Sequence, residues 1–411
     1  MARRKIREYD AKRLLITQLA PIAAKMVNFR GILVNLDTDL SLLPQQYPWL
    51  LTEKLVVKPD QLFGKRKQYG LVVVDVDFEA VKSFITEKQG KEITISKTKG
   101  ALTHFLVEPF VPHQQEYYLA IVAERDGDRI YFSEQGGYNI EERWESVTEI
   151  FVPTLEKAVV ITLPEQVQLF VSKLHELFAQ LDFTYLELNP FTLNAAGEIA
   201  LLDVVAQVDD SAAWKNAALW KNLEFPEPFG RMMTEEEKQI ERLDQNSGAS
   251  LKLTLLNPQG KIWNILSGGG ASILYLDALA RLGGAGEIAN YGEYSGNPTP
   301  EESYQYAKTI LELMIRNEAK KVLFISGAIA NFTDVEKTFY GVAKALREYG
   351  KKLRSQRVSI FVRRGGPNYE QGLKLMKQTG VDLGLPMTVY GPEMPLTRVV
   401  PLGLASLPFT P

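Results

Sequence analysis

The second half of the chain alternates short apolar segments with helical ones, and few folds accommodate that order. Segments of strand length recur, and they are Trp263–Leu266, Lys321–Ile325, Arg357–Val362 and Met387–Tyr390. Helical patterns separate them: an apolar helix ending at Leu282, one over Asp334–Tyr349 and one ending at Thr379. This β-α-β-α-β-α-β order predicts a parallel sheet with helices on both faces, in the doubly wound class of α/β folds.

The first half mixes β and α elements in a less regular order. Strands are expected at Leu55–Lys58, Leu71–Val74, Leu102–Phe110, Tyr117–Ala123 and Arg129–Phe132. A helix broken by Pro21 is expected over Asp10–Phe29, and an amphipathic helix over Pro164–Leu181. These elements predict a domain of mixed α/β structure before the doubly wound one.

A polar stretch, Asp209–Ser247, separates the two halves. It contains the charged run Glu235–Lys238, which is typical of a solvent-exposed face. A chain of 411 residues is also too long for one ordinary core. We therefore expect residues 1–245 to form one domain and residues 246–411 another.

The composition excludes several classes of function. Lys and Arg number 47 against 50 Asp and Glu, a net charge of −3, which is typical neither of nucleic-acid nor of membrane-surface binding. The chain has no Cys, which rules out disulfides, thiolate metal sites and cysteine nucleophiles, and its three histidines are His104, His113 and His175. No stretch approaches the ~18 apolar residues of a membrane helix, and no apolar segment follows the basic N-terminus. We expect a cytoplasmic protein.

Polar or glycine-rich sequence follows three expected strands of the second half, where parallel sheets bind ligands. These segments are Ser267–Ser272, Ala330–Thr333 and Arg363–Asn368. Thr333 and Glu336 form a capping-box pattern, and an arginine pair can grip a carboxylate with two hydrogen bonds. Such donors suit a polycarboxylate, although Thr333 can act only as a helix cap and the arginines can form a surface salt bridge instead.

A fourth glycine-rich segment, Tyr291–Pro298, precedes a second capping-box pattern formed by Thr299 and Glu302. We expect a loop there, close enough to reach the same edge of the sheet.

The first half carries weaker signals that point together to a metal–nucleotide site. Tyr185–Asn189 and Ile199–Asp203 are expected as the arms of a hairpin with its turn at Asn194–Gly197, so Asn189 and Asp203 can face each other. Amide and carboxylate oxygens suit Mg²⁺, which usually keeps substrate phosphates in its shell. Other polar residues near strand ends fit the same site, and they are Lys58, Glu108 and Glu116.

Several segments resemble the amino-terminal part of ATP-citrate lyase, and together they extend over nearly the whole chain. They are Leu55–Gln61, Phe105–His113, Phe183–Pro190, Ser247–Pro258, Ala289–Gly296, Ile329–Thr333 and Phe361–Tyr369. More distantly, the chain resembles the β subunit of succinyl-CoA synthetase. The resemblance implies an ATP-grasp domain followed by a flavodoxin-like, citrate-binding domain.

The resemblance also implies a reaction. ATP phosphorylates a histidine, the phosphoryl group passes to citrate, and coenzyme A displaces phosphate to give citryl-CoA, which is cleaved to acetyl-CoA and oxaloacetate. None of the three histidines lies in the family's phosphohistidine motif; His113 matches a position beside the nucleotide. A partner subunit in a hetero-oligomer is therefore expected to carry the phosphohistidine, a citrate-synthase-like module and most of the coenzyme A site.

The resemblance assigns roles to particular residues. The nucleotide-contacting set is Lys58, Arg66, Lys67, Glu108, Pro109, Val111 and Glu116. Relatives can have Gly at the position of Lys67, so only a backbone role carries over. Glu187 matches a glutamate that steadies the phosphohistidine. The Mg²⁺ ligands implied by the resemblance are Asn189 and Asp203.

Two further sets are implied in the second half. A cation-binding stretch matches Asp244, Ser247 and Ala249, the last through its backbone carbonyl. The citrate contacts are Gly296, Asn331, Thr333, Tyr349 and Arg364. The expected helix places Tyr349 at the opposite end from Thr333.

Three alternatives remain open from the sequence. The chain can be the nucleotide subunit of a succinyl-CoA-synthetase-type ligase, which has no need for Arg364 and Asn331–Thr333 as a tricarboxylate pocket. It can belong to a citryl-CoA synthetase that leaves cleavage to another enzyme. It can also be a non-catalytic module on a decayed ATP-grasp fold, against which the joint presence of Lys58, Asn189 and Asp203 argues.

Overall fold

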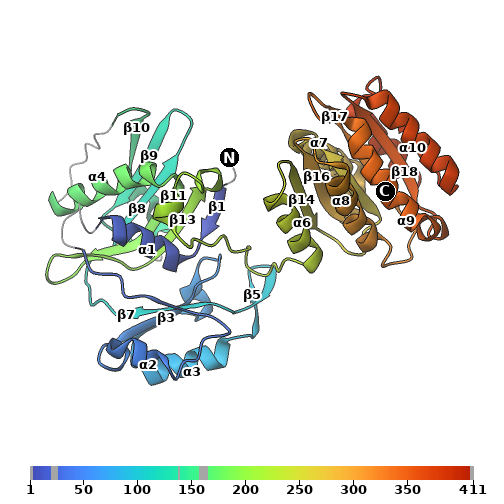
Figure 1. Cartoon of the computed structure of the whole chain (residues 1–411). Helices are drawn as coiled ribbons and strands as arrows, with labels where there is room; N and C mark the ends of the chain where they lie inside the picture. Colours follow the sequence, from blue (N-terminus) through green and yellow to red (C-terminus); the bar gives the residue numbers. More distant parts are fainter. Residues whose placement is uncertain (1–2, 20–25, 138, 157–164, 408–411) are drawn as a thin grey trace. The chain divides into compact units, whose positions relative to one another are not determined.

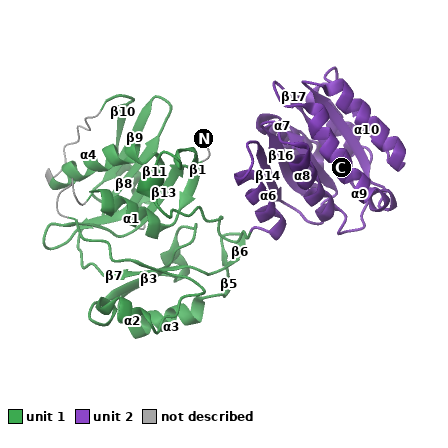
Figure 2. Ribbon diagram, in the orientation of Figure 1, with its two compact units in different colours: residues 1–232 green, residues 233–411 purple. Residues whose placement is uncertain are grey.

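The computed structural model describes residues 3–19, 26–137, 139–156 and 165–407. The chain divides into two compact units, Met1–Met232 and Met233–Pro411 (Figure 1, Figure 2). The division precedes the boundary expected after residue 245, because the helix α6 (Glu235–Gln245) packs against the second unit. Its Ile240 lies in that unit's core.

Unit 1 contains an antiparallel sheet in the order β1-β13-β11-β8-β9-β10, with β12 paired to β11. Its strands are β1 (Arg3–Ile6), β8 (Tyr117–Ala123), β9 (Gly127–Ser133), β10 (Thr148–Pro153), β11 (Phe183–Leu193), β12 (Ile199–Leu201) and β13 (Val204–Asp209). The helices α1 (Glu8–Leu19) and α4 (Glu165–Gln180) bury their apolar faces against it in one shared core. Pro21 and Pro164 of the expected helices lie outside the described residues.

A second, smaller sheet of unit 1 has the order β2-β7-β3-β4. Its strands are β2 (Ile32–Val34), β3 (Leu55–Pro59), β4 (Val73–Val76) and β7 (Phe105–Pro109). Between β4 and β7 in the sequence, β5 (Glu92–Ile95) and β6 (Thr98–Ala101) pair as a separate hairpin. The helix α3 (Phe78–Lys88) packs on this sheet through Phe78, Val81 and Ile85. The short helices α2 (Leu43–Gln46) and α5 (Ala217–Trp220) complete the named helices of the unit.

Unit 2 is the doubly wound domain that the sequence predicts. Its sheet has the order β14-β16-β15-β17-β18-β19. The strands β16 (Asn290–Ser295), β15 (Ile262–Ser267), β17 (Val322–Ile329), β18 (Ser359–Gly365) and β19 (Met387–Tyr390) are parallel. The edge strand β14 (Ser250–Leu255) runs antiparallel to β16.

Helices cover both faces of this sheet. The helices α6, α8 (Pro300–Met314), α9 (Val335–Ser355) and α10 (Tyr369–Leu383) share one core with it. The helices α7 (Gly269–Leu279) and α11 (Val399–Leu404) build a second core on the other face, around Tyr275 and Phe324. Among the described residues, no helix is long and apolar enough to span a bilayer.

Two sequence-based expectations for unit 2 are wrong. Tyr291–Ser295 belongs to the strand β16 and not to a loop, and its polar residues disguise it. Asn290 satisfies its amide by exchanging hydrogen bonds with Asn264 on β15. The charged run Glu235–Lys238 is not simply a solvated face, because Glu237 is 3% exposed and accepts hydrogen bonds from the backbone N–H groups of Thr234 and Leu255.

Candidate functional site

A cavity of about 1220 Å³ in unit 1 is lined by residues from both of its main sheets. All seven residues expected to contact a nucleotide line it, and they are Lys58, Arg66, Lys67, Glu108, Pro109, Val111 and Glu116. Glu187, Asn189 and Asp203 line the same cavity, as does His113. Residues from across the first half of the chain are thus brought to one site.

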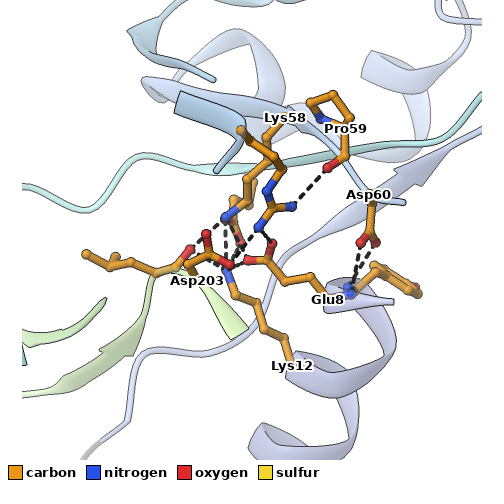
Figure 3. Close-up of polar contacts among 10 residues, drawn as sticks. Glu8, Lys12, Lys58, Pro59, Asp60 and Asp203 are labelled. Carbon is orange, nitrogen blue, oxygen red and sulfur yellow. Dashed lines mark hydrogen bonds and ion pairs between the residues drawn. The ribbon is translucent and has the colours of Figure 1, made fainter. Parts of the chain in front are cut away.

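Lys58, Arg66, Glu108 and Asp203 line this cavity and belong to a network of charged residues whose contacts Figure 3 draws. Lys58 Nζ contacts Glu8 Oε1 at 2.7 Å and Glu108 Oε1 at 3.1 Å, and it donates to the Leu202 carbonyl at 2.7 Å. Arg66 Nη2 contacts Glu8 Oε2 and Asp203 Oδ1, each at 2.6 Å. The two cations expected to meet phosphates are therefore already held by carboxylates of the same chain.

Glu8 and Lys12 take part in this network and are absent from the sequence-based site. Lys12 Nζ lies 2.8 Å from Glu8 Oε1 and 2.8 Å from Glu108 Oε2. Burial would raise the pKa of the Glu8 carboxyl, but the attraction of Lys12, Lys58 and Arg66 outweighs it and holds that pKa well below its ordinary value. One signal was available in the sequence: both charged residues lie on the face of α1 that also buries Leu15 and Leu19.

Asn189, on β11, and Asp203, between β12 and β13, lie opposite each other along the backbone. Leu188 pairs with Val204, and the Asn189 N–H donates to the Asp203 carbonyl at 3.1 Å. Asp203 offers a carboxylate oxygen beside Arg66, and Asn189 offers an amide oxygen that also accepts a hydrogen bond from the Gly137 N–H at 2.9 Å. That donor set fits Mg²⁺ if nucleotide phosphates complete its shell. Within the described residues, no cluster of three or more carboxylates or histidines could hold a metal by itself.

Glu187 extends toward the same cavity from β11. The Tyr185 hydroxyl donates to Glu187 Oε2 at 2.6 Å, which fixes the carboxyl group. Burial raises the pKa of Glu187, and the neighbouring Asp203 charge raises it further. Glu187 is thus a half-buried carboxyl group suited to hydrogen bonding with an incoming polar group.

The three histidines have different surroundings. His113 Nδ1 donates to the Val111 carbonyl at 2.7 Å, and its Nε2 lies 3.2 Å from Glu116 Oε1, so it ties two expected nucleotide contacts together. His175 is buried on α4 and pairs with Asp128 at 2.8 Å. His104 contacts Thr103 and Arg7. Of these three histidines, only His113 is among the described residues that line the cavity.

In unit 2, both arginines of the pair at the end of β18 are buried, which excludes the surface salt bridge. Arg363 has a structural role, because its guanidinium donates to the backbone carbonyls of Gly327, Pro392 and Met394. Arg364 is 3% exposed; its Nη1 donates to the Ala328 carbonyl, and its Nε has no partner among the described residues. Burial lowers the pKa of Arg364.

The loops that carry four expected citrate contacts meet at this edge of the sheet. Gly296 directly follows β16, and the next residue, Asn297, accepts a hydrogen bond from the Asp334 N–H at 2.9 Å, directly beyond Thr333. The Ala330 N–H donates to the Gly365 carbonyl at 2.9 Å, which brings Asn331 near Arg364. Gly327 leaves room for the Arg364 guanidinium, since a Cβ there would lie 2.8 Å from Nη1.

The helix cap at this edge differs from the prediction. Thr299 and Glu302 do form a capping box at the start of α8. Thr333 does not cap α9: Asp334 is the N-cap and accepts from the Lys337 N–H. Thr333 is buried, but its side chain does not cap the helix. Tyr349 lies 16 residues beyond Thr333 in the sequence, a helical rise of roughly 24 Å, and its hydroxyl donates to Glu312, so the structure does not bring it to the other four.

The stretch expected to bind a further cation is already satisfied internally. Asp244 accepts from the Leu251 N–H with one oxygen and pairs with Lys252 through the other, each at 2.6 Å. The Ser247 hydroxyl accepts from the Ala249 N–H at 3.0 Å. A cation at this place would have to displace Lys252.

Comparison with known domain families agrees with this geometry. The model described as "ATP-citrate synthase ATP-grasp domain" matches residues 2–220, and the one described as "ATP citrate lyase citrate-binding" matches residues 231–406. Fold and sites thus define an α/β protein with an ATP-grasp domain followed by a doubly wound domain of the citrate-binding type. The chain belongs to the ATP-citrate lyase (ATP-citrate synthase) family.

Individual relatives show how much of such enzymes this chain represents. It is 48% identical to ATP-citrate synthase alpha chain protein 1 of Arabidopsis thaliana, over 97% of each chain. It is 43% identical to ATP-citrate synthase of Mus musculus over 99% of this chain, but spans 39% of the mouse protein. A solved structure of ATP citrate lyase from Methanothrix soehngenii, in complex with citrate and coenzyme A, matches with a TM-score of 0.88 and 46% identity, over 98% of this chain and 100% of that one.

Proposed function

We propose that the chain is the nucleotide- and citrate-binding subunit of an ATP-citrate lyase, which converts ATP, citrate and coenzyme A into ADP, phosphate, acetyl-CoA and oxaloacetate. The observation that carries this proposal is the pairing, on one chain, of the lysine–arginine–asparagine–aspartate cavity of unit 1 with the buried Arg364 of unit 2. The Methanothrix soehngenii relative binds citrate and coenzyme A, which supports the same substrates here. We also propose that this subunit acts in the cytoplasm.

In unit 1, Lys58 and Arg66 pair with the nucleotide phosphates, and Asn189 and Asp203 are the residues that would hold Mg²⁺. The bound metal would neutralise charge that develops on the transferred phosphoryl group. Lys67 contributes through its backbone, while Pro109, Val111 and Glu116 hold the nucleoside. Because Glu8, Glu108 and Asp203 already pair with these cations, the nucleotide phosphates must exchange with the carboxylates or share the cations with them.

The phosphoryl group leaves the nucleotide for a histidine on a partner subunit. Glu187 accepts a hydrogen bond from that imidazole and fixes its tautomer, so that the other ring nitrogen is free to attack. Tyr185 holds Glu187 in place for this contact. The same partner supplies the citrate-synthase-like module and most of the coenzyme A site. The chain spans 39% of the mouse relative, which is long enough to include a module of this kind.

In unit 2, Arg364 binds one carboxylate of citrate, and Gly296, Asn331 and Thr333 contact the rest. A buried guanidinium without an acidic partner among the described residues is unfavourable until an anion pairs with it. The amino end of α9 adds a positive helix end beside Thr333. These features favour a polycarboxylate over an uncharged substrate.

The test uses the full chain with and without its partner subunit. Alone, the chain should bind Mg·ATP and citrate in calorimetric titrations, take up no acid-labile phosphate from labelled ATP, and release no acetyl-CoA. Labelled phosphate on His104, His113 or His175 would overturn the division of labour between subunits. With the partner present, oxaloacetate should form; accumulation of citryl-CoA without oxaloacetate would identify a citryl-CoA synthetase instead.

A further inference from the structure

The helix α1 sends two charged side chains into the protein behind the nucleotide cavity. Glu8 and Lys12 are one helical turn apart and are 4% and 0% exposed. Neither is among the described residues that line the cavity, whereas Lys58 and Arg66 both are. Burying charges is unfavourable unless each finds good partners, so the contacts of this pair indicate what it is for.

Glu8 joins the two cations that face the cavity (Figure 3). Its Oε1 contacts Lys58 Nζ at 2.7 Å, and its Oε2 contacts Arg66 Nη2 at 2.6 Å. Two like charges on neighbouring side chains repel each other. A carboxylate that contacts one cation with each oxygen lets them lie side by side, as two cations must if they are to meet neighbouring phosphates.

Lys12 fixes this carboxylate from behind. Its ammonium group contacts Glu8, both oxygens of Glu108 and the Leu202 carbonyl, at 2.8–3.0 Å. The start of α1 is itself fixed by Asp60, which accepts from the N–H groups of Glu8 and Tyr9 at 2.8 and 3.0 Å. Glu8 is therefore held at both its backbone and its carboxylate.

We propose that Glu8, supported by Lys12, is a positioning residue for the nucleotide phosphates: it holds Lys58 and Arg66 together at the cavity wall without touching the nucleotide. The inference rests on the proposed nucleotide site of unit 1. It assigns the amino-terminal helix a role in phosphate binding, through charge and geometry at its first turn.

The main test replaces the pair by apolar residues of similar volume, Glu8→Leu with Lys12→Met. This double variant leaves the net charge of the site unchanged, and such replacements of buried ion pairs often preserve stability. Lys58 keeps Glu108 and the Leu202 carbonyl, and Arg66 keeps Asp203 and the Pro59 carbonyl. We expect the affinity for Mg·ATP to fall about tenfold to a hundredfold while the affinity for adenosine is unchanged. Both are measured by displacement of a fluorescent nucleotide from the full chain.

The ratio of the two affinities separates positioning from general support of the fold. An equal loss for Mg·ATP and adenosine, or no loss for either, would overturn the proposal.

Glu8→Asp provides a second variant, since it keeps the charge but is one methylene too short to contact both cations. It should lower the affinity for Mg·ATP relative to that for adenosine. The matched control is Asp10→Asn, which removes another buried carboxylate of α1 that pairs with Arg13 instead. If the wild-type chain fails to bind Mg·ATP, the proposed function fails and not this inference alone.

Discussion

The two units hold their buried cations in opposite ways. In unit 1, Lys58 and Arg66 contact carboxylates of the same chain, so a ligand must exchange with partners that are already present. In unit 2, Arg364 is equally buried, but among the described residues only a backbone carbonyl accepts from it. Under the proposed function, the first arrangement would receive a metal–nucleotide complex that brings its own cation. The second leaves a positive charge that an incoming carboxylate stabilises directly.

The largest effect is expected at the cavity of unit 1. Asp203→Ala should slow phosphorylation of the partner subunit by about a thousandfold or more, because metal-assisted charge neutralisation contributes several kcal/mol to phosphoryl transfer. Phosphorylation is measured as acid-labile label transferred to the partner. The side chain of Asp203 is 36% exposed, so the fold should persist, as thermal unfolding would show. A phosphorylation rate equal to that of wild type would contradict the metal assignment.

The next effect concerns pH and the start of α1. Burial, with the nearby Glu8 charge, raises the pKa of Asp60 from 3.8 to about 6. Between these values Asp60 is ionised in the unfolded chain but protonated in the folded one, so the free energy of unfolding falls as the pH rises, by roughly 3 kcal/mol in total. Glu8 acts oppositely. Because its pKa is lowered in the folded state, its ionised carboxylate stabilises the fold above pH 4.5, and this stabilisation is lost as the pH falls below that value.

Asp60→Asn isolates this contribution. Relative to the variant, the wild-type free energy of unfolding should decrease between about pH 4 and 6 and stay level above that range. Urea unfolding at a series of pH values, with amide exchange in α1 as the local probe, measures the difference. A wild-type–variant difference that is the same at pH 4 and pH 7 would show that Asp60 titrates normally.

In unit 2 the expected effect is on citrate. Arg364→Ala should lower citrate affinity about tenfold to a hundredfold, because a charge-assisted hydrogen bond typically contributes about 1.5–3 kcal/mol. Arg364→Lys should recover only part of it, since a lysine cannot make two parallel hydrogen bonds to one carboxylate. Calorimetric titration of citrate measures both, and Mg·ATP binding serves as the control in the other unit. Equal citrate affinities in wild type and Arg364→Ala would place the carboxylate site elsewhere.

The fold could be predicted from the sequence where apolar periodicity is strong. The strands β8 and β19 have the predicted bounds, and the parallel core of unit 2 follows from regular alternation. The strand β16 could not be found this way, because it buries the polar residues Asn290 and Glu293, the first of them through hydrogen bonds with Asn264 on the neighbouring strand. The cap of α9 was displaced by one residue because Thr333 and Asp334 are both able to cap.

The site could be predicted where residues lie in recognisable motifs. The seven nucleotide-set residues and Asn189, Asp203 and Glu187 all line one cavity. Glu8 and Lys12 could not be assigned, because their role depends on contacts with β3, β7 and the segment after β12, which are far away in the sequence. That they line one cavity does not assign their roles: the nucleotide, metal, citrate and cation-binding roles of all the matched residues remain predictions.

The smallest effect distinguishes the two arrangements most directly. Arg66 pairs with Asp203 in the absence of nucleotide, so Asp203→Asn releases Arg66 for a phosphate while it removes a metal ligand. Without metal, this variant should therefore bind ADP a few-fold more tightly than wild type, because a partly exposed ion pair contributes only about 1 kcal/mol. With Mg²⁺ it should bind ADP more weakly, so the change reverses sign. Asn189→Ala is the matched control: it removes the other proposed ligand but leaves the Arg66–Asp203 pair, so only metal-dependent binding should weaken. Titration of ADP with and without Mg²⁺ decides the matter, and identical metal-free affinities in the two variants would show that the Arg66–Asp203 pair does not restrain Arg66.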